Sequence, residues 1–83
     1  MYKLYGDYKG NWEQLDVAKE EKEIIDSLND FINAEVSDRY MIKETKNNTD
    51  NILCVINTLE DYLDYVSKYE EKQVKKLKFT KGE

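Results

Sequence analysis

The side chains of this sequence that are best suited to chemistry are its carboxylates, which make up 18 of its 83 residues. Glu60 and Asp64 are four residues apart, and Asp61 and Asp64 are three apart, so on a helix either pair could share a cation. A calcium loop also needs a glycine near its centre, and the polar segment KNNTDN, residues 46–51, has none. We therefore expect no metal site and interpret these acids as a solvated helix face.

Groups that activate a nucleophile are scarce. The sequence has no histidine, the commonest general base, and its three glycines are too few for a phosphate-binding loop. Cys54 lies inside the apolar run NILCVIN, residues 51–57, which predicts a small core residue and not a reactive thiol. Two carboxylates could in principle hydrolyse a glycoside, but so short a chain cannot enclose the substrate. We expect a non-enzymatic protein without a cofactor.

The charge of the chain is distributed unevenly. Residues 1–71 contain 17 acidic and 8 basic side chains, whereas residues 72–83 contain five lysines and one glutamate. An acidic body repels nucleic acid and anionic membranes and favours a partner protein with a basic surface. Direct nucleic-acid binding through the lysine-rich end, residues 72–83, is the less favoured alternative.

Features of secreted and membrane proteins are missing from the sequence. The N-terminus MYKLYGDYKG has no long apolar run, and no segment approaches the ~18 apolar residues that a membrane span needs. A single cysteine cannot form an internal disulfide. We expect one domain, residues 1–83, in the cytoplasm, with no membrane partner.

The N-terminal residues predict a β-hairpin. Residues 2–9 and 12–17 are rich in aromatic and alternating side chains, and Gly10–Asn11 between them suits a two-residue type II′ turn. That register would pair Lys9 with Trp12 and Gly6 with Leu15. One face of the hairpin would carry Tyr2, Leu4, Tyr8, Leu15 and Val17, and the other Lys3, Tyr5, Asp7, Trp12 and Gln14.

A helix is predicted over residues 18–35, with Asp16 as its N-cap. Its apolar stripe must pack on another element, because burying five such side chains cannot offset the cost of ordering the helix. The stripe consists of Ile24, Ile25, Leu28, Phe31 and Ile32.

The second half of the chain repeats this order. Residues 39–45 predict a strand, residues 46–50 a turn and residues 51–57 a strand buried on both faces. Thr58 and Asp61 form a capping-box pattern before a helix from Leu59 to about Glu71. Residues 74–80 read as a short basic edge strand or a tail. The expected inward side chains of that helix are Leu59, Tyr62, Leu63 and Val66.

These elements predict an α+β fold of ββαββα order, a small antiparallel sheet with two helices on one face. A second interpretation stays open, in which an N-terminal hairpin, a helix and a short strand precede one long helix from Asp50 to about Val74. That long helix would present a heptad stripe suited to a homodimer. The stripe would consist of Ile52, Val55, Leu59, Tyr62, Val66 and Tyr69.

Two surfaces are candidates for binding a protein. Tyr5 and Trp12 are interface-type aromatics on the expected outer face of the hairpin. The two helices would together present an acidic surface, with Tyr65 beside it, that can imitate the charge of a nucleic-acid backbone. The acids of that surface are Glu23, Asp26, Asp30, Glu60, Asp61, Asp64 and Glu71.

Two segments, CVINTLEDYLDYVSKY and YKLYGDYKGNWEQLDV, resemble small phage and prophage proteins of low-GC Gram-positive bacteria. The resemblance covers about half the chain and transfers no site residue. It implies a mobile-element origin and a role as an inhibitor of host machinery, such as an anti-CRISPR or other anti-defence protein.

Our leading hypothesis is a protein-binding inhibitor that acts in the host cytoplasm on a defence or nucleic-acid-handling complex. It would occlude a basic surface of that complex with its acidic helices. The alternative is a structural or self-assembling phage accessory protein.

Overall fold

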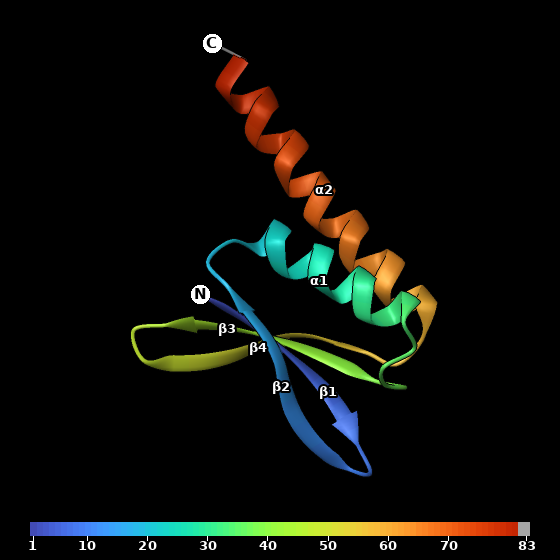
Figure 1. Ribbon diagram of the computed structural model, residues 1–83. Helices are drawn as coiled ribbons and strands as arrows, with labels where there is room; N and C mark the ends of the chain where they lie inside the picture. Colours follow the sequence, from blue (N-terminus) through green and yellow to red (C-terminus); the bar gives the residue numbers. More distant parts are fainter. Residues whose placement is uncertain (82–83) are drawn as a thin grey trace.

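The chain folds into a four-stranded antiparallel sheet whose one face is covered by two helices (Figure 1). The computed structural model describes the backbone of residues 1–81 and the side chains of residues 1–75. The sheet has the strand order β2-β1-β3-β4, and the predicted ββαββα fold is confirmed. The elements are β1 (Tyr2–Tyr8), β2 (Asn11–Ala18), α1 (Glu21–Asn33), β3 (Tyr40–Lys46), β4 (Thr49–Ile56) and α2 (Leu59–Lys81).

The first hairpin forms as predicted, but its turn lies one residue earlier. Tyr8 pairs with Asn11, so the loop residues are Lys9 and Gly10. Both have positive φ, 54° and 87°, which is the type I′ geometry that matches strand twist. Asp7 Oδ1 accepts a hydrogen bond of 2.8 Å from the backbone N–H of Gly10 and holds this turn closed.

A β-bulge at Leu15 then changes the faces of β2. Tyr5 pairs with Gln14 but Leu4 pairs with Asp16, so Leu15 is the extra residue. Leu15 still packs on the core, as expected. Val17, expected on the same face, pairs with Lys3 on the opposite face and is 45% exposed. The predicted pairings of Lys9 with Trp12 and Gly6 with Leu15 are also wrong.

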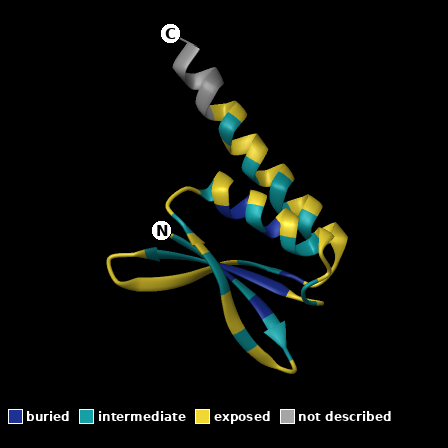
Figure 2. Ribbon diagram, in the orientation of Figure 1, coloured by how far each residue is buried: buried dark blue, intermediate teal, exposed yellow. Residues whose placement is uncertain are grey.

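Helix α1 begins later than predicted, because residues up to Ala18 still pair with β1. Its N-cap is Glu20, which forms a capping box with Glu23. Asp16, the predicted cap, instead accepts a hydrogen bond of 2.5 Å from the Ser27 hydroxyl. The predicted stripe does pack on the sheet, and the buried core between the two layers consists of Leu4, Ile24, Ile25, Leu28, Tyr40, Ile42 and Ile56 (Figure 2).

Strand β4 excludes the long helix from residue 50, since residues 49–56 pair with β3. The strand was expected to be buried on both faces, and this is wrong because the helices cover only one face of the sheet and β4 lies at its edge. Ile52 is 60% exposed and Leu53 is also exposed. The capping box that ends β4 is confirmed: the backbone N–H of Asp61 donates to Thr58 Oγ1, and the N–H of Thr58 donates to Asp61 Oδ2, both at 3.2 Å.

Helix α2 is longer than predicted and reaches Lys81, so the strand considered for residues 74–80 does not form. The last two residues of the basic end, 82–83, lie outside the described residues. Figure 1 shows α2 crossing beside α1 and continuing past the sheet. Leu59 and Leu63, expected inward, are 63% and 56% exposed. The side chains that pack toward the core are Tyr62, Tyr65, Val66 and Tyr69.

Tyrosine hydroxyls attach α2 to α1. The hydroxyl of Tyr62 donates to Asn29 Oδ1 at 3.1 Å, and that of Tyr65 donates to Glu21 Oε2 at 2.5 Å. Lys72 Nζ lies 3.6 Å from the Glu21 carboxylate. Because the start of α2 meets the end of α1, the two helices run antiparallel.

Candidate protein-binding site

The face of the sheet opposite the helices carries a mixed aromatic, aliphatic and cationic surface, which we call the outer sheet face. Residues that lie directly opposite each other on paired strands point to the same face of the sheet. Tyr5 is opposite Gln14 and Met41, and Asp7 is opposite Trp12. Tyr5 and Trp12 therefore share this face, as predicted. Its residues are Lys3, Tyr5, Asp7, Trp12, Gln14, Val17, Met41, Lys43, Thr45, Asp50, Ile52 and Val55.

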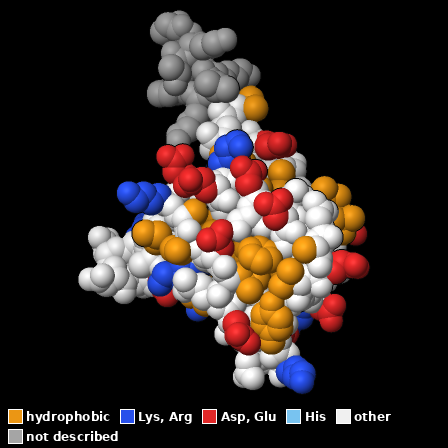
Figure 3. Space-filling view, viewed as in Figure 1, with side chains coloured by type: hydrophobic (Ala, Val, Ile, Leu, Met, Phe, Trp, Pro, Cys, Tyr) orange, Lys and Arg blue, Asp and Glu red, His pale blue; other side chains and the backbone are white. Residues whose placement is uncertain are grey.

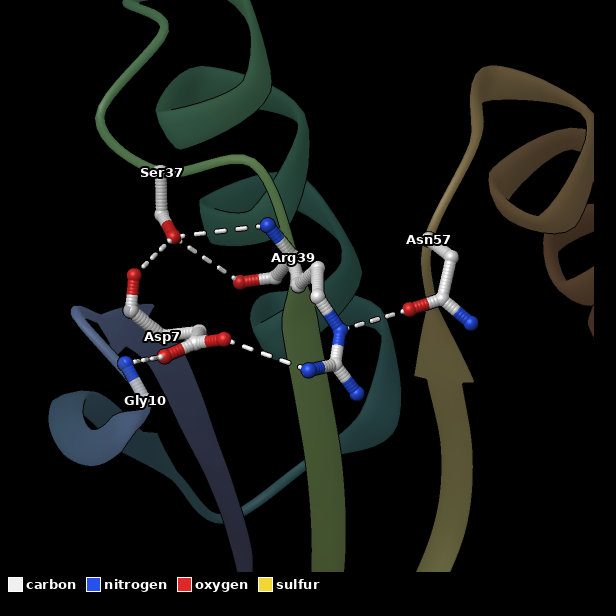
Figure 4. Close-up of polar contacts among 5 residues, drawn as sticks. All are labelled: Asp7, Gly10, Ser37, Arg39 and Asn57. Carbon is white, nitrogen blue, oxygen red and sulfur yellow. Dashed lines mark hydrogen bonds and ion pairs between the residues drawn. The ribbon is translucent and has the colours of Figure 1, made fainter.

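Arg39, just before β3, organises one end of this face (Figure 4). Its Nε donates to Asn57 Oδ1 at 2.8 Å, and its Nη1 lies 3.2 Å from Asp7 Oδ2. Its guanidinium carbon lies 5.1 Å from the centroid of the Trp12 ring, in a cation–π contact. These contacts join the first hairpin, the start of β3 and the end of β4.

Ser37 fixes the backbone beneath this arginine (Figure 4). Its hydroxyl lies 2.6 Å from the carbonyl oxygen of Asp7 and 3.1 Å from that of Arg39. The N–H of Asp7 donates to the Arg39 carbonyl oxygen at 3.1 Å, which extends the β1–β3 pairing. The Asp7 side chain is only 16% exposed, so the arginine is held by a partly desolvated carboxylate.

A small apolar patch occupies the centre of the outer sheet face. Met41 is 5% exposed although no helix covers it, because it pairs with Tyr5 on one side and Val55 on the other. Lys43 Nζ lies 5.1 Å from the Tyr5 ring centroid. The aromatic rings and the two cations thus surround a methionine that is itself buried beneath them.

The charges of this face are almost balanced. Lys3, Arg39 and Lys43 face two acids, and both acids are paired: Asp7 with Arg39, and Asp50 with Lys3 at 3.6 Å. A hydrogen bond from Thr45 also lowers the pKa of Asp50. The outer sheet face is therefore slightly cationic on an acidic protein.

The acids predicted to form a second surface lie on the other side of the molecule, over the two helices. In Figure 3 several acidic side chains lie close together in the upper part of the molecule, where Figure 1 places the helices. Two of them form exposed lysine pairs, Asp26 with Lys22 at 3.1 Å and Asp64 with Lys68 at 3.7 Å. The exposed members are Glu23, Asp26, Asp30, Glu60, Asp64 and Glu71.

Two residues assigned to the acidic surface have structural roles instead. Asp61 is partly buried and accepts hydrogen bonds from the N–H groups of Asn57 and Thr58. Tyr65 packs against the core and donates to Glu21, so it does not lie beside the exposed acids. Burial and this hydrogen bond raise the pKa of Tyr65 far above its ordinary value.

The two candidate binding surfaces lie on opposite sides of the molecule. Tyr5 and Trp12 lie on the outer sheet face, whereas the acids lie over the helices, so a single flat partner cannot contact both. Sequence reasoning missed Arg39 and Met41. The sequence contains one signal for Arg39, which is that it is the sole arginine of a chain with 12 lysines.

Reactive groups are few among the described residues. Burial raises the pKa of the Cys54 thiol to about 12, which disfavours the nucleophilic thiolate. No group of three or more Cys, Asp or Glu side chains in the described part of the chain is arranged to hold a metal ion. None of the described helices is both long and apolar enough to cross a membrane.

The fold and its uncovered face define a small two-layer α+β protein with one helical face and one open sheet face. Comparisons with protein-family models, with curated proteins and with solved structures found no match to this chain.

Proposed function

We propose that this protein is a non-enzymatic binding module that docks on a partner protein through its outer sheet face, with Trp12, Arg39 and Tyr5 as the anchors. The observation that carries the proposal is the Trp12–Arg39 contact, held by Asp7 and Asn57 on an uncovered sheet. Tryptophan, tyrosine and arginine are the residue types that contribute most binding energy at protein interfaces.

The rigidity of these anchors supports the proposal. Arginine normally loses side-chain entropy on binding, but three partners already fix Arg39 in the free protein. The apolar patch around Met41 supplies the water-excluding surface that interface anchors require. The partner would contribute carboxylates or carbonyl oxygens toward Arg39 and Lys43, and apolar side chains toward the rings of Trp12 and Tyr5.

The resemblance to phage proteins extends this proposal to a biological role. In that role the partner is a host protein of a defence or nucleic-acid-handling complex, and docking blocks a surface that the complex needs. The inhibitor would act in the host cytoplasm.

A second candidate is binding of a basic protein through the acidic helices. Its support is the charge of α1 and of α2 up to Lys75, which together carry nine acidic and four basic side chains. Exposed lysine pairs such as Lys68–Asp64 contribute little stability, so a basic partner could displace them.

Affinity capture from a low-GC Gram-positive host lysate separates the two candidates. The variants are Trp12→Ala for the outer sheet face and the double change Asp30→Lys with Glu71→Lys for the helices. The two acids of the double change are exposed, and neither side chain takes part in the N-cap of a helix. Circular dichroism would check that each variant is folded.

We expect Trp12→Ala to reduce capture at least tenfold, which corresponds to the ~1.4 kcal/mol or more typical of an interface anchor. The helix variant should capture as well as the parent protein, at low and at high salt. Loss of capture in the helix variant but not in Trp12→Ala would favour the acidic surface. Capture by the parent protein that is lost only at high salt would favour it as well. Failure of the parent protein to retain any partner would overturn both candidates.

A further inference from the structure

The two edges of the sheet differ in how they are protected. Both edge strands contain a bulge, at Leu15 in β2 and at Leu53 in β4. Strand β2 carries charged side chains at Glu13 and Asp16, which discourage pairing with another strand. By contrast, the one charged side chain of β4 is Asp50 near its start, which is paired with Lys3, and residues 51–56 contain no charge.

The edge of β4 is also apolar and exposed. Ile52 and Leu53 are among the exposed large hydrophobic residues, and they stand on opposite sides of the strand plane beside a row of outward backbone groups. An exposed apolar edge strand is a template for pairing with another chain. The β4 edge over residues 51–56 is therefore better suited to a strand partner than the β2 edge.

The flank of α2 beside β4 suggests which partner that is. Asp64 and Lys68 lie over β4, where they line a shallow hollow with Leu53 and Cys54. They are one helical turn apart and both largely exposed. A second copy related by a twofold axis would run its α2 antiparallel to the first, and this would bring Asp64 of each copy near Lys68 of the other.

We propose that β4 pairs antiparallel with β4 of a second copy, so that two chains form one continuous eight-stranded sheet. The paired strands satisfy their edge hydrogen bonds, Ile52 of each copy becomes covered, and the Asp64 and Lys68 side chains complement each other across the axis. The two outer sheet faces would then form one doubled surface. This inference does not depend on the proposed function.

Sedimentation velocity over a range from low micromolar to several hundred micromolar tests the proposal. The test variant is Ile52→Asp, and the matched control is Val17→Asp on the other edge. Both positions are exposed on the outer sheet face, and each pairs with a lysine, Lys43 or Lys3, that can accommodate the new carboxylate. The control therefore reproduces the charge change without touching β4.

We expect the parent protein and Val17→Asp to sediment as dimers at the high end of this range, and Ile52→Asp to remain a monomer throughout. A monomeric parent at the highest concentration would overturn the proposal. So would loss of the dimer in Val17→Asp alone, or growth beyond a dimer, which would mean open-ended edge pairing.

A charge swap gives a second measurement that does not depend on changing the strand. Asp64→Lys should weaken the dimer by about tenfold, since it places like charges across the axis. Adding Lys68→Asp to that variant should restore the parent dissociation constant. Equal weakening of the dimer in the single and double variants would exclude the twofold arrangement. Binding of an added foreign β-strand peptide by a protein that does not dimerise would also overturn the proposal, because the partner of β4 would then be a different chain.

Discussion

At the scale of single residues, Gly6 is a position in β1 where the fold leaves little room for a side chain. A Cβ atom placed there would lie 2.9 Å from Leu15 Cδ1 and 3.4 Å from the Ser37 Cβ. Leu15 is the bulge residue of β2, so the missing side chain of Gly6 makes space for the bulge to turn inward. The same bulge moves Val17 onto the outer sheet face.

We predict that Gly6→Ala lowers the free energy of unfolding by about 1–2 kcal/mol, because the new methyl group displaces Leu15. Leu15→Ala alone should also destabilise, since it removes a side chain that packs on the core. The double variant should lose less unfolding free energy than the two single variants lose together, because the clash between the new methyl group and Leu15 is gone. Urea unfolding of the four proteins measures this, and strictly additive losses would contradict the explanation.

Cys54 provides a prediction about pH. Its pKa is raised to about 12 by burial, whereas an unfolded cysteine titrates near ~8.5. The folded state therefore keeps a proton that the unfolded state loses, so stability should be fully present below about pH 8.5 and decline as pH rises toward 12. Cys54→Ala should show a shallower decline between these values in urea-unfolding series.

Thiol labelling checks the same point under native conditions. At pH 8 iodoacetamide should modify the folded protein at least tenfold more slowly than the urea-unfolded protein, because few folded molecules hold a thiolate. Equal rates in the two states would contradict the burial of Cys54.

Some of these residue-level features were predictable from the sequence and others were not. Strict alternation along β1 was enough to assign Tyr5 to the outer face. The predicted partner of Trp12 was wrong, but it is offset by two residues, Lys9 in place of Asp7, and an even offset leaves Trp12 on the same face. Arg39 was not predictable as a site residue, because its partners Asp7 and Asn57 are 32 and 18 residues away. Its role depends on tertiary structure.

At the scale of elements, the start of α2 depends on a local signal that the sequence contains in full. Thr58 and Asp61 exchange hydrogen bonds across the first turn, and Asp61 Oδ2 also accepts from the N–H of Asn57 at 2.9 Å. These contacts satisfy N–H groups that a helix start otherwise leaves unpaired. They also stop β4 at Ile56 and exclude the long-helix alternative.

We predict that Asp61→Ala costs about 1 kcal/mol of unfolding free energy, through loss of this cap. Asp64→Ala, one turn further on, should change stability by less than about 0.5 kcal/mol, since its lysine pair is exposed. Thermal or urea unfolding below the concentration at which the protein associates compares the two variants. Equal losses of unfolding free energy in the two variants would show that the negative charge near the start of α2, and not the cap, stabilises the helix.

The elements that were predicted with errors show where local patterns become ambiguous. The apolar stripe of α2 fits two overlapping faces, one with Leu59 and Leu63 and one with Tyr62, Tyr65 and Tyr69. The tyrosine face packs inward because its hydroxyl groups reach acceptors on α1 while the rings cover the core. The choice therefore depends on where α1 lies, which the sequence of α2 does not contain.

At the scale of the whole molecule, the two-layer arrangement determines which side chains can act together. The fold order was predictable because each half of the chain repeats a hairpin followed by a helix. The placement of Tyr5 and Trp12 on the face away from the helices was also predictable, whereas the neighbours that the strand order gives them, such as Met41 and Lys43, were not. A binding mechanism for this protein must therefore use one face at a time, or two partners at once.

The central claim is that a partner docks over Trp12, and the chain contains one tryptophan. Incorporation of 5-fluorotryptophan would give a single fluorine NMR resonance from the outer sheet face, which can be followed while a captured partner is added. We predict a shift of this resonance at a stoichiometric amount of partner, together with loss of its solvent-isotope effect. An unchanged resonance while the partner is bound would contradict docking through the outer sheet face.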